Sequence, residues 1–209
     1  MNITFHFDFI SPYAYLAWTQ IHALAARHGG RVVPVPTLLA ALLAHGATKG
    51  PAEIPAKRAY LVVDTIRTAR LLGVPFVPPA SHPFNPLLSL RVASLDASDD
   101  ERRARIDALF SAAWAKGEPI DTVEAVTRVL GDPDLARRAQ DPAAKERLRT
   151  QTEAAIAAGV FGVPTMVVGG DMFWGVDSLG HLERHLRGEG VDTRAEMAKW
   201  SPVRATAQR

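Results

Sequence analysis

The change of hydrophobic period between residues 9 and 14 constrains the fold of this chain more than any other feature. Apolar and polar residues alternate from residue 3 to residue 9, which predicts a strand with one buried face. Apolar residues then recur at helical spacing from residue 14 to residue 25. Ser11 and Pro12 lie between the two patterns, where serine is a favoured N-cap and proline a favoured first helical residue. The Ser11 hydroxyl is therefore expected at a helix N-terminus, which is either a place to hold an anion or only a cap.

The rest of the chain returns to strands only near its end. Residues 31–36 predict a short strand, which its two prolines assign to a sheet edge. Residues 37–151 show helical patterns interrupted by prolines, and residues 165–174 predict a hairpin that turns at Gly169 and Gly170. A last helix follows, with leucines on one face. The order is strand-helix-strand, a helical block, and then strand-strand-helix.

This order predicts an α/β protein with a thioredoxin-like fold, in which an all-helical insertion separates the βαβ half from the ββα half. Residues 1–36 and 152–187 are expected to form the thioredoxin-like domain. Residues 37–151 are expected to form the helical insertion subdomain, and residues 188–209 a partly loose C-terminal tail.

Composition excludes several classes of function. The chain has a net charge of +2 and no cysteine, so it lacks the charge of a typical nucleic-acid binder and can form neither a disulfide nor a cysteine nucleophile. No metal site is expected, because His181 and His185 share a helix face without a third ligand. Neither a secretory signal nor a membrane span is visible, so we expect a cytoplasmic protein without a membrane partner. Any thiol chemistry here needs a thiol from outside.

Two segments far apart in the sequence correspond to the two parts of a thioredoxin-type site. Such redox proteins carry Cys-x-x-Cys at the start of the helix after the first core strand. Here Ser11 and Ala14 replace the two cysteines, so the redox chemistry is removed while the helix start remains. Val163-Pro164 precedes the third strand, where we expect a cis peptide bond opposite Ser11; an ordinary proline before a strand is the alternative.

Several motifs together give the chain a resemblance to a known family. They are residues 7–13 (FDFISPY), 49–51 (KGP), 82–86 (HPFNP), 159–165 (GVFGVPT) and 173–177 (FWGVD). In this order, over about residues 2–187, the chain resembles the 2-hydroxychromene-2-carboxylate isomerases, which are relatives of the kappa-class glutathione transferases. Each motif alone is weakly specific, and their order carries the signal.

The resemblance implies bound glutathione as the cofactor. Ser11 would be the catalytic residue and would donate a hydrogen bond to the glutathione sulfur. The remaining glutathione-binding residues implied by the resemblance are Val163, Pro164, Trp174, Gly175, Val176 and Asp177. Val176 stands where relatives often carry a polar residue. Asp177 is also a candidate N-cap for the last helix, and the two roles can coexist.

The resemblance also implies a small aromatic carboxylate as substrate and a homodimer as the assembly. Lys49, Asn85 and Pro86 would bind the substrate from the inner wall of the insertion, with Arg58 and Tyr60 as further candidates. The implied reaction, in aromatic hydrocarbon catabolism, opens the chromene ring and interconverts the cis and trans isomers by reversible thiolate addition. A glutathione transferase and a non-catalytic thioredoxin-fold protein that binds glutathione or a peptide are the alternatives.

Overall fold

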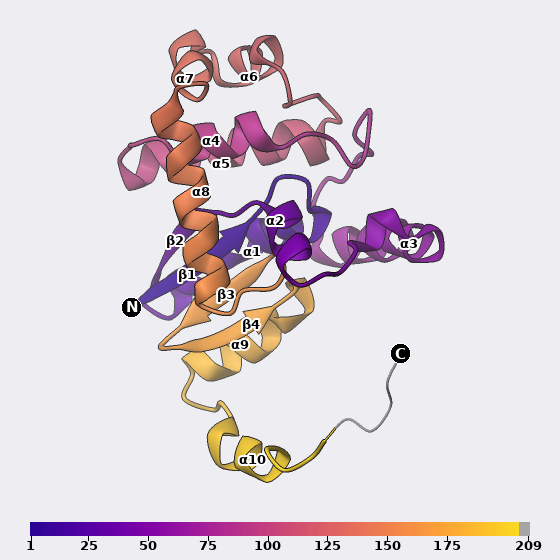
Figure 1. Cartoon of the computed structure of the whole chain (residues 1–209), viewed down its shortest axis with the longest axis vertical. Coiled ribbons are helices and arrows are strands. Elements are labelled where there is room, and N and C mark those ends of the chain that lie inside the picture. Colours follow the sequence, from indigo (N-terminus) through magenta and orange to yellow (C-terminus); the bar gives the residue numbers. More distant parts are fainter. Residues whose placement is uncertain (205–209) are drawn as a thin grey trace.

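A four-stranded mixed sheet in the order β2-β1-β3-β4 forms the centre of the molecule, for which a computed structural model describes residues 1–204 (Figure 1). Its strands are β1 (Asn2–Phe7), β2 (Arg31–Pro36), β3 (Thr165–Val168) and β4 (Asp171–Trp174). β1 pairs with β2 in parallel and with β3 antiparallel, and β3 and β4 form the predicted hairpin. The structure thus confirms the predicted thioredoxin-like fold.

Helices separate the two halves of the sheet, as the sequence predicted. α1 (Pro12–Arg27) connects β1 to β2. The insertion between β2 and β3 contains α2 (Leu39–His45), α3 (Pro55–Leu72), α4 (Leu87–Ser94), α5 (Asp99–Phe110), α6 (Val123–Leu130), α7 (Pro133–Arg138) and α8 (Pro142–Ala157). The predicted boundary at residue 151 falls inside α8, and the division into domains stays a prediction.

After the sheet come α9 (Leu179–Leu186) and, within the predicted tail, α10 (Thr193–Trp200). The expectation for residues 205–209 lies outside the described residues. No helix within residues 1–204 combines the length and the apolar composition that crossing a membrane would require.

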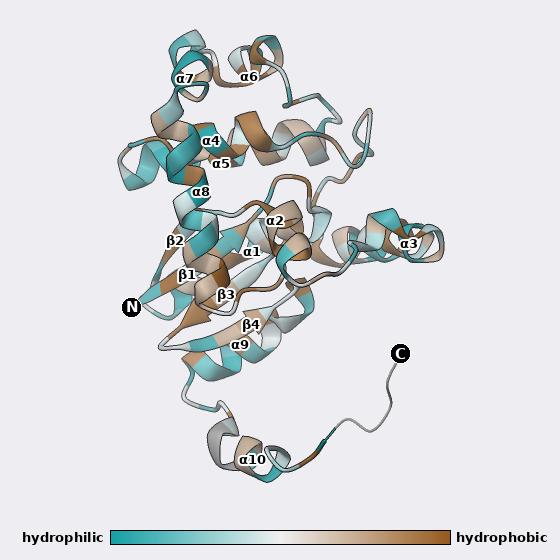
Figure 2. Ribbon diagram, in the orientation of Figure 1, coloured by the Kyte–Doolittle hydropathy of each residue, from teal (hydrophilic) through white to brown (hydrophobic). Residues whose placement is uncertain are grey.

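The sheet and the insertion share one hydrophobic core. Phe5, Phe7 and Phe9 of the first strand and its continuation are fully buried, and Figure 2 shows hydrophobic residues concentrated at this centre. The ring of Phe110 in α5 lies 5.5 Å from that of Phe7 and 4.7 Å from that of Phe9, measured between ring centroids. Because insertion side chains complete the core, the loop after β1 is packed from both sides.

Strand β2 forms an edge of the sheet, as its prolines predicted. The Arg31 amide donates to the Met1 carbonyl, and the Thr37 amide donates to the Phe7 carbonyl. The amide groups of the odd-numbered residues of β2 therefore point toward β1. Pro34 and Pro36 alternate with them, so their nitrogens, which carry no hydrogen, face the outer edge.

Candidate functional site

Ser11 caps α1 and lies at the carboxyl end of β1. Its Oγ accepts a hydrogen bond from the Ala14 amide at 3.2 Å, and Pro12 is the first helical residue. The serine is buried, with 6% of its surface exposed. The cap therefore exists, and it also places a hydroxyl at the positive end of a 16-residue helix.

Val163 and Pro164 lie opposite Ser11 although 152 positions separate Ser11 from Val163 in the chain. The Ser11 hydroxyl is 3.5 Å from the Val163 carbonyl oxygen, and the Val163–Pro164 peptide bond has the cis geometry that the sequence predicted. A hydrogen bond of 3.5 Å is at the weak limit, so the hydroxyl hydrogen can be given to a ligand at little cost. The two segments form one site, as the order of elements predicted.

A buried carboxylate holds the loop before Ser11 from one side. Asp8 is fully buried and accepts hydrogen bonds from the Ile10 amide at 3.1 Å and the Leu39 amide at 2.9 Å. Burial raises the pKa of Asp8 to about 7, although both backbone hydrogen bonds favour the charged form. Asp8 thus connects the Ser11 loop to the start of α2.

Two insertion side chains hold the same loop from the other side. The Trp114 indole donates from Nε1 to the Phe9 carbonyl at 2.8 Å, and Nε2 of His82 lies 2.9 Å from the Ile10 carbonyl oxygen. The His82 ring meets the Trp114 ring edge-on, at 5.5 Å between centroids. No role at this loop was predicted for His82 or Trp114, because hydrophobic periodicity does not encode the path of residues 76–86.

Four of the residues that the resemblance assigns to glutathione binding run from Trp174, the last residue of β4, to Asp177. The Gly175 amide donates to the Pro164 carbonyl at 2.9 Å, which joins this segment to the Ser11 site. Gly175 has a φ of 91°, and a Cβ built on Gly162 would lie 2.6 Å from Nε1 of Trp174, so both positions require glycine. Trp174 is 54% exposed, with its ring against that of Phe161.

Val176 and Asp177 lie in a short 3-10 turn, Val176–Ser178, ahead of α9. Val176 is half-buried and Asp177 is exposed. The alternative role of Asp177 as the N-cap of α9 is wrong, because Ser178 occupies that position. Ser178 makes no side-chain capping bond there. The Asp177 carboxylate acts electrostatically on the phenol of Tyr13, so this turn lies close to the start of α1.

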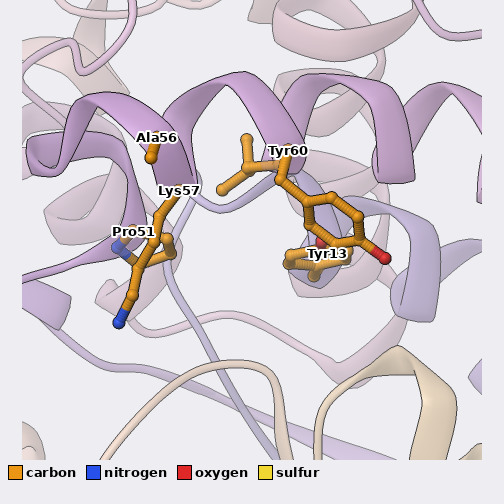
Figure 3. Close-up of a pocket in the computed structure, with 6 residues that line it drawn as sticks. Tyr13, Pro51, Ala56, Lys57 and Tyr60 are labelled. Atoms are coloured by element: carbon orange, nitrogen blue, oxygen red, sulfur yellow. The ribbon is translucent and has the colours of Figure 1, made fainter.

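A cavity of about 340 Å³ lies between the start of α1 and α3. Its lining consists of Tyr13, Pro51, Ala56, Lys57, Tyr60 and Leu61. In Figure 3 the ring of Tyr60 lies beside Tyr13, and Lys57 extends past Pro51. The lining is apolar except for the phenol groups and the single ammonium group, a combination that suits an aromatic ring bearing a negative charge.

The predicted substrate-binding residues lie elsewhere. Lys49 is exposed, two residues before the 3-10 turn Pro51–Glu53. Asn85 is exposed and its Oδ1 accepts from the Leu87 amide at 3.1 Å, while Pro86 is buried at the start of α4. None of the three lines the cavity beside Tyr13, whereas the weaker candidate Tyr60 does. Lys57 had no distinguishing sequence signal, since it is one of several cations near the start of α3.

Comparisons with known proteins agree with this geometry. Residues 2–187 match the family described as the DSBA-like thioredoxin domain. A 2-hydroxychromene-2-carboxylate isomerase from Pseudomonas putida is 34% identical over 190 residues, which cover 88% of this chain and 93% of that protein. A solved structure of a 2-hydroxychromene-2-carboxylate isomerase, 32% identical, superposes with a TM-score of 0.82 over 96% of this chain and 100% of that chain. Glutathione S-transferase kappa 2 from Caenorhabditis elegans is 28% identical over 182 residues, covering 78% of this chain and 79% of that protein.

Proposed function

The chain belongs to the 2-hydroxychromene-2-carboxylate isomerase family of DSBA-like thioredoxin domains, and from this premise we propose that it is a glutathione-dependent isomerase of 2-hydroxychromene-2-carboxylate-type substrates. The proposal includes ring opening and cis/trans isomerisation to a benzylidenepyruvate, in the degradation of aromatic compounds. The observation that carries it is the buried Ser11 hydroxyl at the α1 N-terminus, facing the Val163 carbonyl in a chain without cysteine.

The residues around Ser11 fit glutathione. When bound, glutathione supplies the nucleophilic thiol that this chain lacks. Within residues 1–204 the Val163 amide donates to no backbone carbonyl, so it can donate to the peptide-like backbone of a ligand. Glycine at positions 162 and 175 lets the side chains of Trp174 and Asp177 lie close to the backbone on the Pro164 side of the site. The far end of the same surface is bordered by Trp174, Val176 and Asp177.

Ser11 and the α1 N-terminus favour the charged form of a bound thiol. A free thiol with a pKa of about 8.5 is only a few per cent ionised at neutral pH. A helix end contributes roughly 0.3–1 kcal/mol, and a hydrogen bond to a charged group contributes roughly 1.5–3 kcal/mol. Both contributions come from the same few atoms at the start of α1 and lower the pKa of a thiol placed there.

We assign substrate binding to the cavity beside Tyr13. Its apolar walls suit the aromatic ring of the substrate. The Lys57 ammonium group, which lines the cavity, is the cation that would pair with the substrate carboxylate. Lys49, Asn85 and Pro86 remain proposed substrate contacts from the insertion side. A cytoplasmic homodimer remains part of the proposal, and size-exclusion chromatography with light scattering tests the dimer.

Replacing Ser11 tests the proposed function. Ser11→Ala removes the hydrogen bond to the sulfur and keeps the helix end, so turnover should fall about 10- to 100-fold at 1.4 kcal/mol per tenfold. The pH dependence of thiolate absorbance on bound glutathione should move to higher pH. Ser98→Ala is the matched control, because Ser98 caps α5 by the same type of bond to the Glu101 amide. Unchanged turnover and an unchanged thiol pKa in Ser11→Ala would show that Ser11 is only a cap.

The likeness to a kappa-class glutathione transferase supports one alternative function. A transferase releases the thiol adduct, whereas an isomerase returns glutathione after each turnover. Counting glutathione against product therefore separates the two: an isomerase consumes none. Binding of glutathione without turnover of any conjugated carboxylate would support the non-catalytic alternative.

A further inference from the structure

Helix α3 forms one wall of the cavity yet contributes little to the hydrophobic core. Its buried side chains are Leu61, Thr65 and Ala69, while Tyr60 is 62% exposed and Leu71 is 86% exposed. Figure 1 shows α3 standing away from the sheet, near the start of α1. A helix packed in this way needs other interactions to fix its position relative to Ser11.

The first such interaction connects α3 to the residue that follows Pro12. The Tyr13 hydroxyl donates to Oδ2 of Asp64 at 2.7 Å. Partial burial and this hydrogen bond raise the pKa of Tyr13, so the phenol keeps its proton at neutral pH. The bond therefore joins the middle of α3 to the first turn of α1, two residues after Ser11.

The second interaction reaches the residue just before Ser11. Arg58 donates from Nη2 to the His82 carbonyl at 3.0 Å, and the His82 ring lies 2.9 Å from the Ile10 carbonyl oxygen through Nε2. Because a carbonyl only accepts, Nε2 must carry the hydrogen. The first turn of α3 is thus linked, through the side chains of Arg58 and His82, to the peptide group between Ile10 and Ser11.

The cavity lies between these two links. Tyr60 and Leu61 lie between Arg58 and Asp64 in α3, and Lys57 directly precedes Arg58. Tyr13 forms the opposite wall (Figure 3). A ligand in the cavity therefore contacts the segment of α3 that is bonded to both flanks of Ser11. Restricting α3 restricts the Ser11 loop as well.

We propose that Asp64, Tyr13, Arg58 and His82 are positioning residues that tie α3 to both flanks of Ser11, so that an aromatic carboxylate in the cavity and a thiol at Ser11 bind cooperatively. The inference rests on the proposed function. Cooperativity between two sites is reciprocal: each ligand strengthens the other by the same factor, typically about 5- to 150-fold.

Calorimetry with an unreactive probe tests the proposal. Salicylate serves as the aromatic carboxylate, and the affinity for glutathione is measured with and without saturating salicylate. In the wild type, salicylate should tighten glutathione binding about 5-fold or more, and glutathione should tighten salicylate binding equally. In the double variant Asp64→Leu/His82→Leu this factor should fall toward one.

Conservative variants separate positioning from simple structural support. His82→Gln keeps an N–H donor near Nε2, and Asp64→Asn keeps an acceptor for Tyr13, so both should preserve the cooperativity. The Leu variants should lower kcat about 3- to 10-fold with little change in the affinity for glutathione alone. Arg67→Met is the matched control, because Arg67 is exposed on the face of α3 opposite Arg58.

The outcomes are distinct. The proposed role of α3 is overturned if the folded double variant shows the same cooperativity as the wild type. It is also overturned if the wild type shows no cooperativity. Wild-type protein that binds no glutathione contradicts the proposed function, and the inference falls with it. If the double variant does not fold, Arg58→Met breaks only the link to the His82 carbonyl, and unchanged cooperativity and kcat in that variant overturn the proposal.

Discussion

On the sheet side of Ser11, Phe5, Phe7 and Phe9 are fully buried, whereas across the cavity, on α3, Tyr60 is 62% exposed and Val63 43%. The sheet side derives its geometry from apolar packing that continues into α1 and α5. The α3 side is fixed largely by single polar bonds. The proposed thiol site therefore lies on the rigid wall, and the proposed substrate site lies against the wall that can adjust.

This difference has a chemical reason under the proposed function. Stabilising a thiolate needs a hydroxyl and a helix end held at fixed positions, because the benefit of preorganised dipoles is lost when they reorient. An aromatic substrate is bound mainly by apolar contact, which tolerates small shifts of the wall. The following changes test the contrast, from the largest expected effect to the smallest.

Phe7→Ala should be the most destabilising of these changes. The Phe7 ring lies 5.2 Å from that of Phe9 and 5.5 Å from that of Phe110, so its removal leaves a cavity shared by the sheet and the insertion. The free energy of unfolding should fall by about 3–5 kcal/mol. Denaturant unfolding measures the loss, and a loss below about 1 kcal/mol would refute the description of this wall as rigidly packed.

The Asp8→Asn variant should gain stability relative to the wild type as the pH rises. The folded pKa of Asp8, about 7, lies above the unfolded value near 3.8, so its contribution is fully present below pH 4 and is lost as the pH rises toward 7. The unfolding free energy of the variant minus that of the wild type should rise by up to about 1.4 kcal/mol per pH unit in this window.

Denaturant unfolding at pH 5 and pH 8 measures this difference. Burial lowers the pKa values of His6 and His22 to about 4, so the protein loses their contributions to stability as the pH falls. These contributions are the same in the variant and the wild type, and they cancel in the difference between the two. A difference that stays constant between the two pH values would show that Asp8 is ionised throughout.

Lys57→Met should raise KM about 2- to 5-fold and leave kcat nearly unchanged, because an exposed ion pair contributes roughly 0.5–1 kcal/mol of uniform binding. Lys49→Met removes the same charge at the other proposed substrate contact, outside the cavity, so the pair of variants compares the two candidate cations. Steady-state kinetics with a carboxylate substrate gives both values. A larger rise in KM for Lys49→Met would place the carboxylate nearer to Lys49 than to the cavity.

Val63→Gln should have the smallest effect. Val63 is on the exposed part of α3, so the unfolding free energy should change by no more than about 0.5 kcal/mol. Thermal unfolding compared with the wild type measures it. A loss of 2 kcal/mol would mean that this face of α3 is covered in solution, which would contradict its description as an open wall.

The backbone of the site could be predicted from the sequence, and much of its side-chain surroundings could not. Periods of two and 3.6 residues located β1 and α1, and the strand order then implied that Val163 meets Ser11. His82 and Trp114 escaped prediction, because their roles depend on a proline-rich loop folding back onto carbonyl groups. Backbone carbonyls leave no mark in a sequence, so their partners cannot be recognised from it.

The substrate side was harder for a related reason. Lys49 was chosen by its neighbours in the sequence, while the cavity is built where α3 passes Tyr13, a relation set by tertiary packing. Asp8 offered a signal that was available but unused: a carboxylate among buried phenylalanines of a strand needs partners, and the structure supplies the Ile10 and Leu39 amides.

The outward-facing prolines of β2 also limit how the molecule can associate with others. Pro34 and Pro36 present no N–H group along the outer edge of the strand, so another strand cannot extend the sheet there by continuous hydrogen bonding. Edge-to-edge association, a common route to aggregation, is closed at this side of the sheet. Strand pairing between two copies would consequently have to use the short β4 edge.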